Sequence, residues 1–244
     1  MRYFIEFSYN GTNYHGWQIQ PNAITVQEVL NKNLSLLLKE EIYTIGAGRT
    51  DTGVHAQQMY AHFDSSGTFD LNLLVYKLNA LLPKDIAVHQ ILPVHPEAHA
   101  RFDAYSRTYQ YHIHSKKNVF YNELSWQFLY PLDLNKMNQA AQILLNFTDF
   151  QCFSKVHTDV NTFNCKITYA QWTIENNEIT FTITADRFLR NMVRAIVGTL
   201  VNVGLNKVSI SEFVSIIESK DRNKAGFSVP AHGLFLTEIK YPYL

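Results

Sequence analysis

The order of apolar patterns along the first hundred residues is the feature that most restricts the fold. A strand-like run at residues 1–9 precedes a helix that should begin at Thr25, where a capping-box arrangement is followed by leucines at helical spacing. Two further strand-like runs lead to a shorter helix capped by Asp70, and a last strand covers residues 86–94. This order of elements, β-α-β-β-α-β, is typical of ferredoxin-like folds.

The second half of the chain nearly repeats this order. The expected elements are a strand at 105–114, a helix at 133–147, a hairpin at 167–185, a helix at 188–203, a helix from residue 209 and a strand at 234–241. No low-complexity linker separates the halves, so we expect residues 1–104 and residues 105–244 to share one mainly antiparallel sheet. The sequence therefore predicts an α+β fold made of two similar halves.

The composition is that of a folded protein with a substantial core. Of the 244 residues, 46 % are hydrophobic and 17 % are charged, which excludes a disordered chain. No apolar run approaches the roughly 20 residues that a membrane span requires, and the first residues are typical of a strand rather than of a signal peptide. We therefore expect a cytoplasmic protein that has no membrane partner.

The charge balance argues against nucleic-acid binding by bulk charge, and the cysteine and histidine pattern argues against a metal site. Lys plus Arg and Asp plus Glu are equal at 21 each, which argues against nucleic-acid binding by bulk charge but is compatible with a local basic surface. Cys152 and Cys165 are too few for a disulfide framework and are expected to be free thiols. His95 and His99 have a zinc-like spacing, but Pro96 breaks the required helix and a third ligand is not evident. We therefore expect no metal site.

A glycine-rich loop at residues 46–56 carries the groups best suited to chemistry. It lies between strand-like runs at 42–45 and 59–63, and its three glycines let a ligand approach the backbone closely. Asp51 is ordinarily ionised at neutral pH, and the cation of Arg49 two positions away favours that form further. Asp51 is therefore a candidate nucleophile, base or charge stabiliser rather than an acid. A turn in which Asp51 bonds only its own backbone is the alternative.

The strand expected at 105–114 carries aromatic and basic side chains on one face. Alternation puts four residues on that face: Tyr105, Arg107, Tyr109 and Tyr111. Aromatic residues in a strand often belong to the core, but an arginine among them favours a surface on which a nucleobase stacks. The helix expected at 188–203 and the residue before it would align Arg187, Arg190 and Arg194 in a stripe. Such a stripe is either a solvated face or a track for phosphates.

Several segments, in the same order along the chain, resemble the TruA-type tRNA pseudouridine synthases. They are Tyr9–Gln18, Gly48–Ala56, His99–Phe102, Ser106–Tyr111, Asp149–Phe153, Phe188–Arg194 and Pro230–Leu234. The resemblance covers most of the chain. It implies the pseudouridine synthase fold, in which two ferredoxin-like halves share a sheet that carries a central active-site cleft.

The resemblance also implies a reaction and a role for four residues. Asp51 would be the catalytic aspartate that breaks the N-glycosidic bond of a target uridine, after which the uracil rejoins through carbon. Tyr109 would stack on the flipped uracil, Arg49 would help to hold the extruded nucleotide, and Arg194 would pair with Asp51. The targets would be uridines at positions 38, 39 and 40 of the tRNA anticodon stem-loop. The enzyme would need no cofactor and would work as a homodimer.

Two departures from the family pattern and two other functions remain open. Thr52 stands where relatives often have alanine, a small change that we expect to be tolerated. Cys165 stands near a position where relatives often carry arginine, and Lys166 is a possible substitute.

A non-catalytic RNA-binding module also uses an aromatic sheet, but it has no use for the Asp51 loop. An aspartic protease needs two Asp-Thr-Gly carboxylates, and only one such tripeptide occurs.

Overall fold

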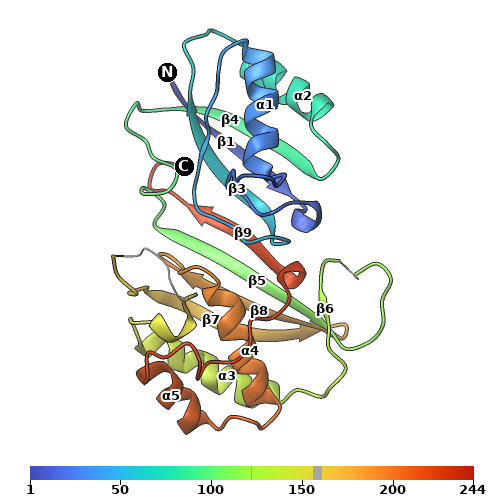
Figure 1. Cartoon of the computed structure of the whole chain (residues 1–244), viewed down its shortest axis with the longest axis vertical. Coiled ribbons are helices and arrows are strands. Elements are labelled where there is room, and N and C mark those ends of the chain that lie inside the picture. Colours follow the sequence, from blue (N-terminus) through green and yellow to red (C-terminus); the bar gives the residue numbers. More distant parts are fainter. Residues whose placement is uncertain (122, 156–160) are drawn as a thin grey trace. The chain divides into compact units, whose positions relative to one another are not determined.

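Nine β-strands and five α-helices make up the part of the chain that the structure describes (Figure 1). This computed structural model covers residues 1–121, 123–155 and 161–244. The chain divides into two units, the first made of Met1–Tyr105 with Leu236–Leu244, the second of Ser106–Phe235. The strand pairs resolved within the two units are antiparallel, except for one short parallel pair. The predicted α+β class with mainly antiparallel strands is therefore confirmed.

The first unit consists of a sheet with two helices packed beside it (Figure 1). Its strands follow the order β4-β1-β3-β9, with the short β2 on β3. The bounds are β1 Arg2–Tyr9, β2 Ile45–Gly46, β3 His55–Asp64, β4 Ile86–Val94, β9 Leu234–Lys240, α1 Val26–Leu38 and α2 Leu71–Leu81. Strand β1 pairs with β3 on one side and β4 on the other, so its backbone is fixed along both edges.

Local signals predicted both helix starts of the first unit but not β2. Thr25 caps α1 by accepting a hydrogen bond from the backbone of Glu28 (3.3 Å), and Asp70 caps α2 in the same way. The strand expected at 42–45 is wrong, because only Ile45 belongs to β2. The backbone N–H and the hydroxyl of Thr44 both donate to the side-chain oxygen of Asn31 (3.1 and 2.6 Å). Asn31 on α1 thus accepts the backbone N–H of Thr44, which would otherwise be available to pair with a neighbouring strand.

The second unit is built from a hairpin, a neighbouring strand and three helices. Its strand order is β5-β8-β7, with β6 running parallel to the end of β5. The bounds are β5 Ser106–His114, β6 Trp126–Gln127, β7 Ile167–Glu175, β8 Glu178–Ala185, α3 Leu134–Ile143, α4 Met192–Gly204 and α5 Ile210–Glu218. The predicted hairpin is confirmed, with Asn176 and Asn177 in the left-handed conformation (φ 50° and 65°) that a two-residue turn requires. The predicted caps Asp133 and Ser209 are confirmed as well.

The start of α4 differs from the prediction and changes the arginine pattern. The helix begins at Met192 rather than Phe188, because Asn191 adopts a left-handed conformation (φ 66°) that an α-helix cannot contain. Arg187 and Arg190 therefore precede the helix, and only Arg194 lies on it. The predicted stripe of three arginines on one helix is wrong.

In both units an asparagine on a helix hydrogen-bonds to the backbone of an outer strand. On α2, the side-chain amide of Asn79 both donates to and accepts from the backbone of Val88 in β4 (2.8 Å each). On α3, Asn138 forms the equivalent pair with Trp172 in β7 (3.0 and 2.8 Å). Each asparagine stands in for a missing strand partner and so attaches a helix to the outer strand of its unit.

Candidate active site

The Asp51 loop connects β2 to β3 and leaves its acid accessible. Thr50 is buried, Asp51 is half-buried and Arg49 is exposed. The backbone N–H of Val54 donates to the carbonyl of Asp51 (3.1 Å), which closes a tight turn directly after the aspartate. The loop therefore presents a carboxylate and a guanidinium two positions apart, on a backbone that is folded back against β3.

A segment just after β1 holds this loop in place. The backbone of Trp17 donates to the carbonyl of Thr50 (3.4 Å), and the backbone of Gly53 donates to the carbonyl of Tyr14 (3.3 Å). The N–H of Gly11 donates to the buried ring nitrogen Nδ1 of His55 (3.0 Å). These three bonds run between segments about 40 residues apart in the sequence. The loop conformation is thus fixed from outside rather than by its own turn residues alone.

Tyr109 lies on β5 and is half-buried, with its ring edge-on to Phe188 (centroids 5.2 Å apart, planes at 87°). The other aromatic residues of the predicted face behave differently. Tyr111 is fully buried and donates its hydroxyl to the carbonyl of Pro230 (2.9 Å), whereas Tyr105 is 57 % exposed. The predicted aromatic face therefore divides along the strand into a core residue at one end and accessible rings at the other.

Arg194 lies in the first turn of α4 and is half-buried. Its Nε donates to the carbonyl of Val229 (2.7 Å), and the N–H of Val229 donates back to the carbonyl of Arg194 (3.3 Å). These two hydrogen bonds hold the Arg194 side chain, up to its Nε atom, against the segment that precedes β9. Of the four residues predicted for the site, Arg49 and Asp51 thus share a loop of the first unit, and Tyr109 and Arg194 belong to the second.

Comparison with known proteins identifies the family. A family model described as tRNA pseudouridine synthase matches residues 6–103 and 140–242. The chain belongs to the tRNA pseudouridine synthases. A tRNA pseudouridine synthase A of Parabacteroides distasonis is 55 % identical, with 99 % of this chain and 96 % of that protein aligned. The proteins of the same name from Bacteroides fragilis (99 % and 96 % aligned) and Thermoanaerobacter pseudethanolicus (97 % and 98 % aligned) are 54 % and 44 % identical. The predicted family and its isomerase class are therefore confirmed.

The sequence singled out Arg107, Lys166 and Arg187 separately but did not predict that all three meet at Asp186. Arg107 donates to the backbone carbonyl of Asp186 (2.7 Å), and the carboxylate of Asp186 accepts from the backbones of Lys166 (2.8 Å) and Arg187 (2.7 Å). Asp186 thus gathers three cationic residues at the connection between β8 and α4. Alternation pointed to Arg107, but the bonds that bring it to Asp186 join residues 79 positions apart and leave no local signal.

The structure also shows the surroundings of Cys165 and Lys166, where the sequence departs from the family pattern. Cys165 is buried, and burial raises the pKa of its thiol to about 12, so this side chain is an unreactive core group. Lys166 beside it is exposed. Of these two neighbours, only Lys166 has a side chain that solvent can reach.

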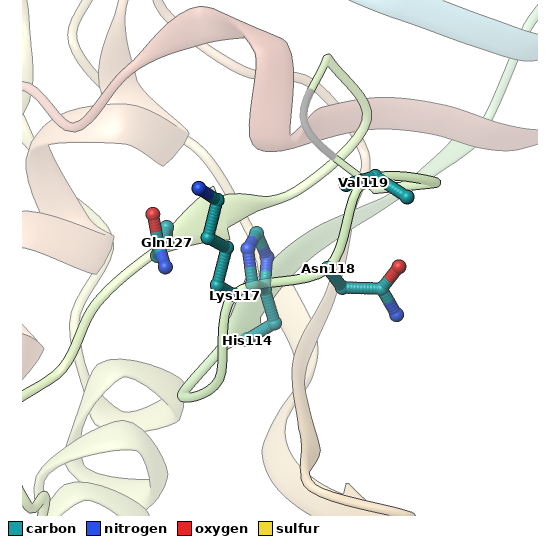
Figure 2. Close-up of a pocket in the computed structure, with 5 residues that line it drawn as sticks. All are labelled: His114, Lys117, Asn118, Val119 and Gln127. Atoms are coloured by element: carbon teal, nitrogen blue, oxygen red, sulfur yellow. The ribbon is translucent and has the colours of Figure 1, made fainter.

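A small cavity of the second unit is separate from the predicted site residues. It has a volume of about 150 Å³ and is lined by His114, Lys117, Asn118, Val119 and Gln127. Figure 2 shows the Asn118 side chain pointing away from Lys117 and Gln127. The volume is below the roughly 300 Å³ at which ligand pockets usually begin. We therefore do not assign the active site of the synthase to this cavity.

Neither a metal-ligand group nor a membrane-spanning helix occurs among the described residues. Within residues 1–121, 123–155 and 161–244, no three His, Cys, Asp or Glu side chains are grouped as metal ligands. Among the same residues, no helix has the length and apolar character that crossing a membrane demands.

Proposed function

We propose that this chain converts uridines at positions 38, 39 and 40 of the tRNA anticodon stem-loop to pseudouridine. In this isomerisation the bond from ribose C1′ to N1 of uracil breaks and a bond from C1′ to C5 forms. The proton on C5 leaves for solvent, and N1 gains one. Since no electrons or groups are exchanged with another molecule, the reaction requires no cofactor. We further propose that the enzyme acts as a homodimer in the cytoplasm.

One observation carries this proposal: the family motif Gly48–Ala56 forms an externally held loop on which Asp51 is half-buried. A catalytic carboxylate must meet an extruded nucleotide in a fixed geometry, and loops held by a rigid scaffold suit that task. In our proposal Asp51 breaks the N-glycosidic bond. Arg49, on the same loop, holds the extruded nucleotide by its phosphate or sugar.

Tyr109 has the properties needed to receive a flipped base. Extruding a base from a stem costs a few kcal/mol, and stacking on an aromatic ring returns about 1 to 3 kcal/mol per base. The ring of Tyr109 is half-buried and is held edge-on by Phe188, which restricts its rotation before RNA arrives. We propose that Tyr109 stacks on the target uracil and that Arg194 acts with Asp51.

The decisive experiment measures tritium release from tRNA that carries uridine labelled at C5, without any added cofactor. We expect release by the wild-type chain and a loss of at least about 1,000-fold for Asp51→Asn, with tRNA binding retained. Thr52→Ala is the matched control at the adjacent position and should release tritium normally. Replacing uridines 38, 39 and 40 by cytidine should abolish release by the wild type.

Two outcomes would contradict the proposal. Tight tRNA binding by the wild type without tritium release would favour a non-catalytic RNA-binding protein. Normal release by Asp51→Asn would remove the catalytic role of this residue while leaving the family assignment intact.

A further inference from the structure

A buried pair of hydroxyl groups lies directly beside Asp51. The hydroxyl of Tyr9 and Oγ1 of Thr50 are 2.9 Å apart, and the two residues are 4 % and 9 % exposed. Buried hydroxyls destabilise a protein unless they are hydrogen-bonded, so this pair is favourable only while both partners are present. It joins the end of β1 to the residue that precedes the proposed catalytic aspartate.

Thr50 is held on two sides. Its carbonyl accepts from the backbone of Trp17 (3.4 Å), and its hydroxyl bonds Tyr9 (2.9 Å). Threonine is β-branched, so fixing Oγ1 also fixes its single side-chain torsion relative to the backbone. Since the next peptide carbonyl, that of Asp51, accepts from Val54 (3.1 Å), the Cα atom of Asp51 is held from both directions along the chain.

Tyr9 is itself a rigid anchor. It ends β1, the strand that is paired along both edges, and its ring stacks on that of Phe7 (centroids 6.1 Å apart, planes at 27°). The register with β3 shifts between Phe7 and Tyr9, whose partners are Met59 and Ala56. Such bulges occur next to active sites, where they redirect a side chain. Here the shift accompanies the turn of the Tyr9 hydroxyl toward Thr50.

We propose that Tyr9 is a positioning residue for the reaction: its hydrogen bond to Thr50 sets the direction in which Asp51 presents its carboxylate. This inference rests on the proposed catalytic role of Asp51. Through this bond β1, which is paired along both edges, restrains a loop that lies outside the helices and strands. A displacement of about 1 Å in a catalytic group lowers turnover by about 100-fold, so the loss of one such bond is measurable.

The test compares four variants in single-turnover tritium release, tRNA binding and thermal unfolding. Tyr9→Phe removes the hydroxyl and keeps the ring, and Thr50→Val removes Oγ1 at constant shape. Thr50→Ser restores an oxygen at that position, and the double variant Tyr9→Phe/Thr50→Val removes both partners. Tyr241→Phe is the matched control, because it removes a buried hydroxyl of the same unit that donates to the carbonyl of Ala100 (2.5 Å), a residue outside the Asp51 loop.

We expect Tyr9→Phe to lower the single-turnover rate constant about 10- to 100-fold while the Kd for tRNA changes less than about twofold. Thr50→Val should also slow the reaction, and the double variant should be no slower than the slower single variant, since the bond between these two hydroxyls is lost in all three. Thr50→Ser should stay within about threefold of the wild type. Tyr241→Phe should lower the Tm by as much as Tyr9→Phe does without slowing release.

Several results would overturn the inference. They are a wild-type rate for Tyr9→Phe, multiplicative losses in the double variant, or an equal slowing by Tyr241→Phe, which would mark a general effect of stability. If Asp51→Asn loses turnover while Tyr9→Phe keeps it, the positioning role alone is refuted. If Asp51→Asn keeps turnover or the wild type releases no tritium, the proposed function fails and the inference fails with it.

Discussion

The two units support their proposed site residues in different ways. In the first unit, the loop around Asp51 has an irregular backbone, and its conformation depends on hydrogen bonds from residues 9–17. In the second unit, Arg194 lies on a regular helix whose own backbone bonds define its shape, and the segment 226–230 packs against that helix and hydrogen-bonds to Arg194 and Thr199. Contacts from other segments therefore determine the conformation of the Asp51 loop in the first unit. In the second unit they determine how α4 packs, but not its shape.

This difference predicts which property a mutation changes. Disturbing the contact between segment 226–230 and α4 should reduce stability, because the helix keeps its shape while its packing is lost. Disturbing the contact between residues 9–17 and the Asp51 loop should reduce activity more than stability, because the loop would fold into a different conformation. Glycines at both contacts allow a direct comparison.

Gly198→Ala should have the largest effect on stability. A Cβ atom at Gly198 would lie 1.9 Å from the backbone oxygen of Phe227, so the segment and the helix would have to separate. We expect a loss of about 3 kcal/mol, larger than the gain of about 1 kcal/mol that alanine brings to a helix. Denaturant unfolding measures this loss. Gly204→Ala is the matched control on the same helix, because its Cβ would meet the flexible end of Met137 (2.5 Å). Equal losses for the two variants would contradict the close backbone contact.

Gly11→Ala should have a smaller effect on stability but a clear effect on turnover. Its Cβ would lie 2.0 Å from the backbone oxygen of Val54, which pushes the Asp51 loop away from the segment after β1. We expect a loss of about 2 kcal/mol and a decrease of about tenfold or more in tritium release. Gly48→Ala, with no atom within 4 Å of its Cβ, should change stability by less than about 0.5 kcal/mol. A Gly11→Ala protein with normal turnover would show that the loop does not depend on this contact.

Fold elements were predictable where their signals are local. Thr25, Asp70, Asp133 and Ser209 each cap a helix through an N–H three residues further on, so their short patterns were sufficient. The start of α4 was not predictable, because the left-handed Asn191 bonds its side chain to Ser228, 37 positions later (2.6 Å). The apolar spacing of Leu189 and Met192 continues through this turn and imitates a longer helix.

In the candidate site too, local motifs were predictable and long-range contacts were not. Arg49 and Asp51 belong to one glycine-rich motif, and Tyr109 belongs to an alternating strand, so sequence alone selected them. Their catalytic and binding roles remain predictions. The contact between Tyr9 and Thr50 joins residues 41 positions apart. Both residues lie in family-like segments, but nothing in either segment indicates that the two side chains meet. Long-range contacts that support a site are set by the fold, and a single sequence carries no direct signal for them.

His62 provides a last and smaller prediction, because its burial should make the first unit sensitive to acid. Burial lowers the pKa of His62 to about 4, and the charges of Arg2 and of protonated His99 act in the same direction. Its Nδ1 accepts from the N–H of Ala100 (3.1 Å), which requires the unprotonated nitrogen. In the second unit, burial also lowers the pKa of His112, but Glu178 at 2.9 Å opposes that shift. Burial lowers the pKa of His114 and His232 of the second unit as well, so both units should lose stability in acid, and His62 has the largest of these shifts.

The sign follows from proton binding by the unfolded chain. An unfolded histidine titrates near about 6.5, so between about pH 6.5 and 4 the unfolded state binds a proton that folded His62 refuses, and stability falls as the pH falls. Linkage gives a loss of about 1.4 kcal/mol from His62 between pH 7.5 and 5.5. His62→Asn keeps an acceptor for Ala100 but cannot titrate, so its denaturant midpoint should fall less than that of the wild type over this range. A His62→Asn protein as acid-sensitive as the wild type would assign the acid response to other groups.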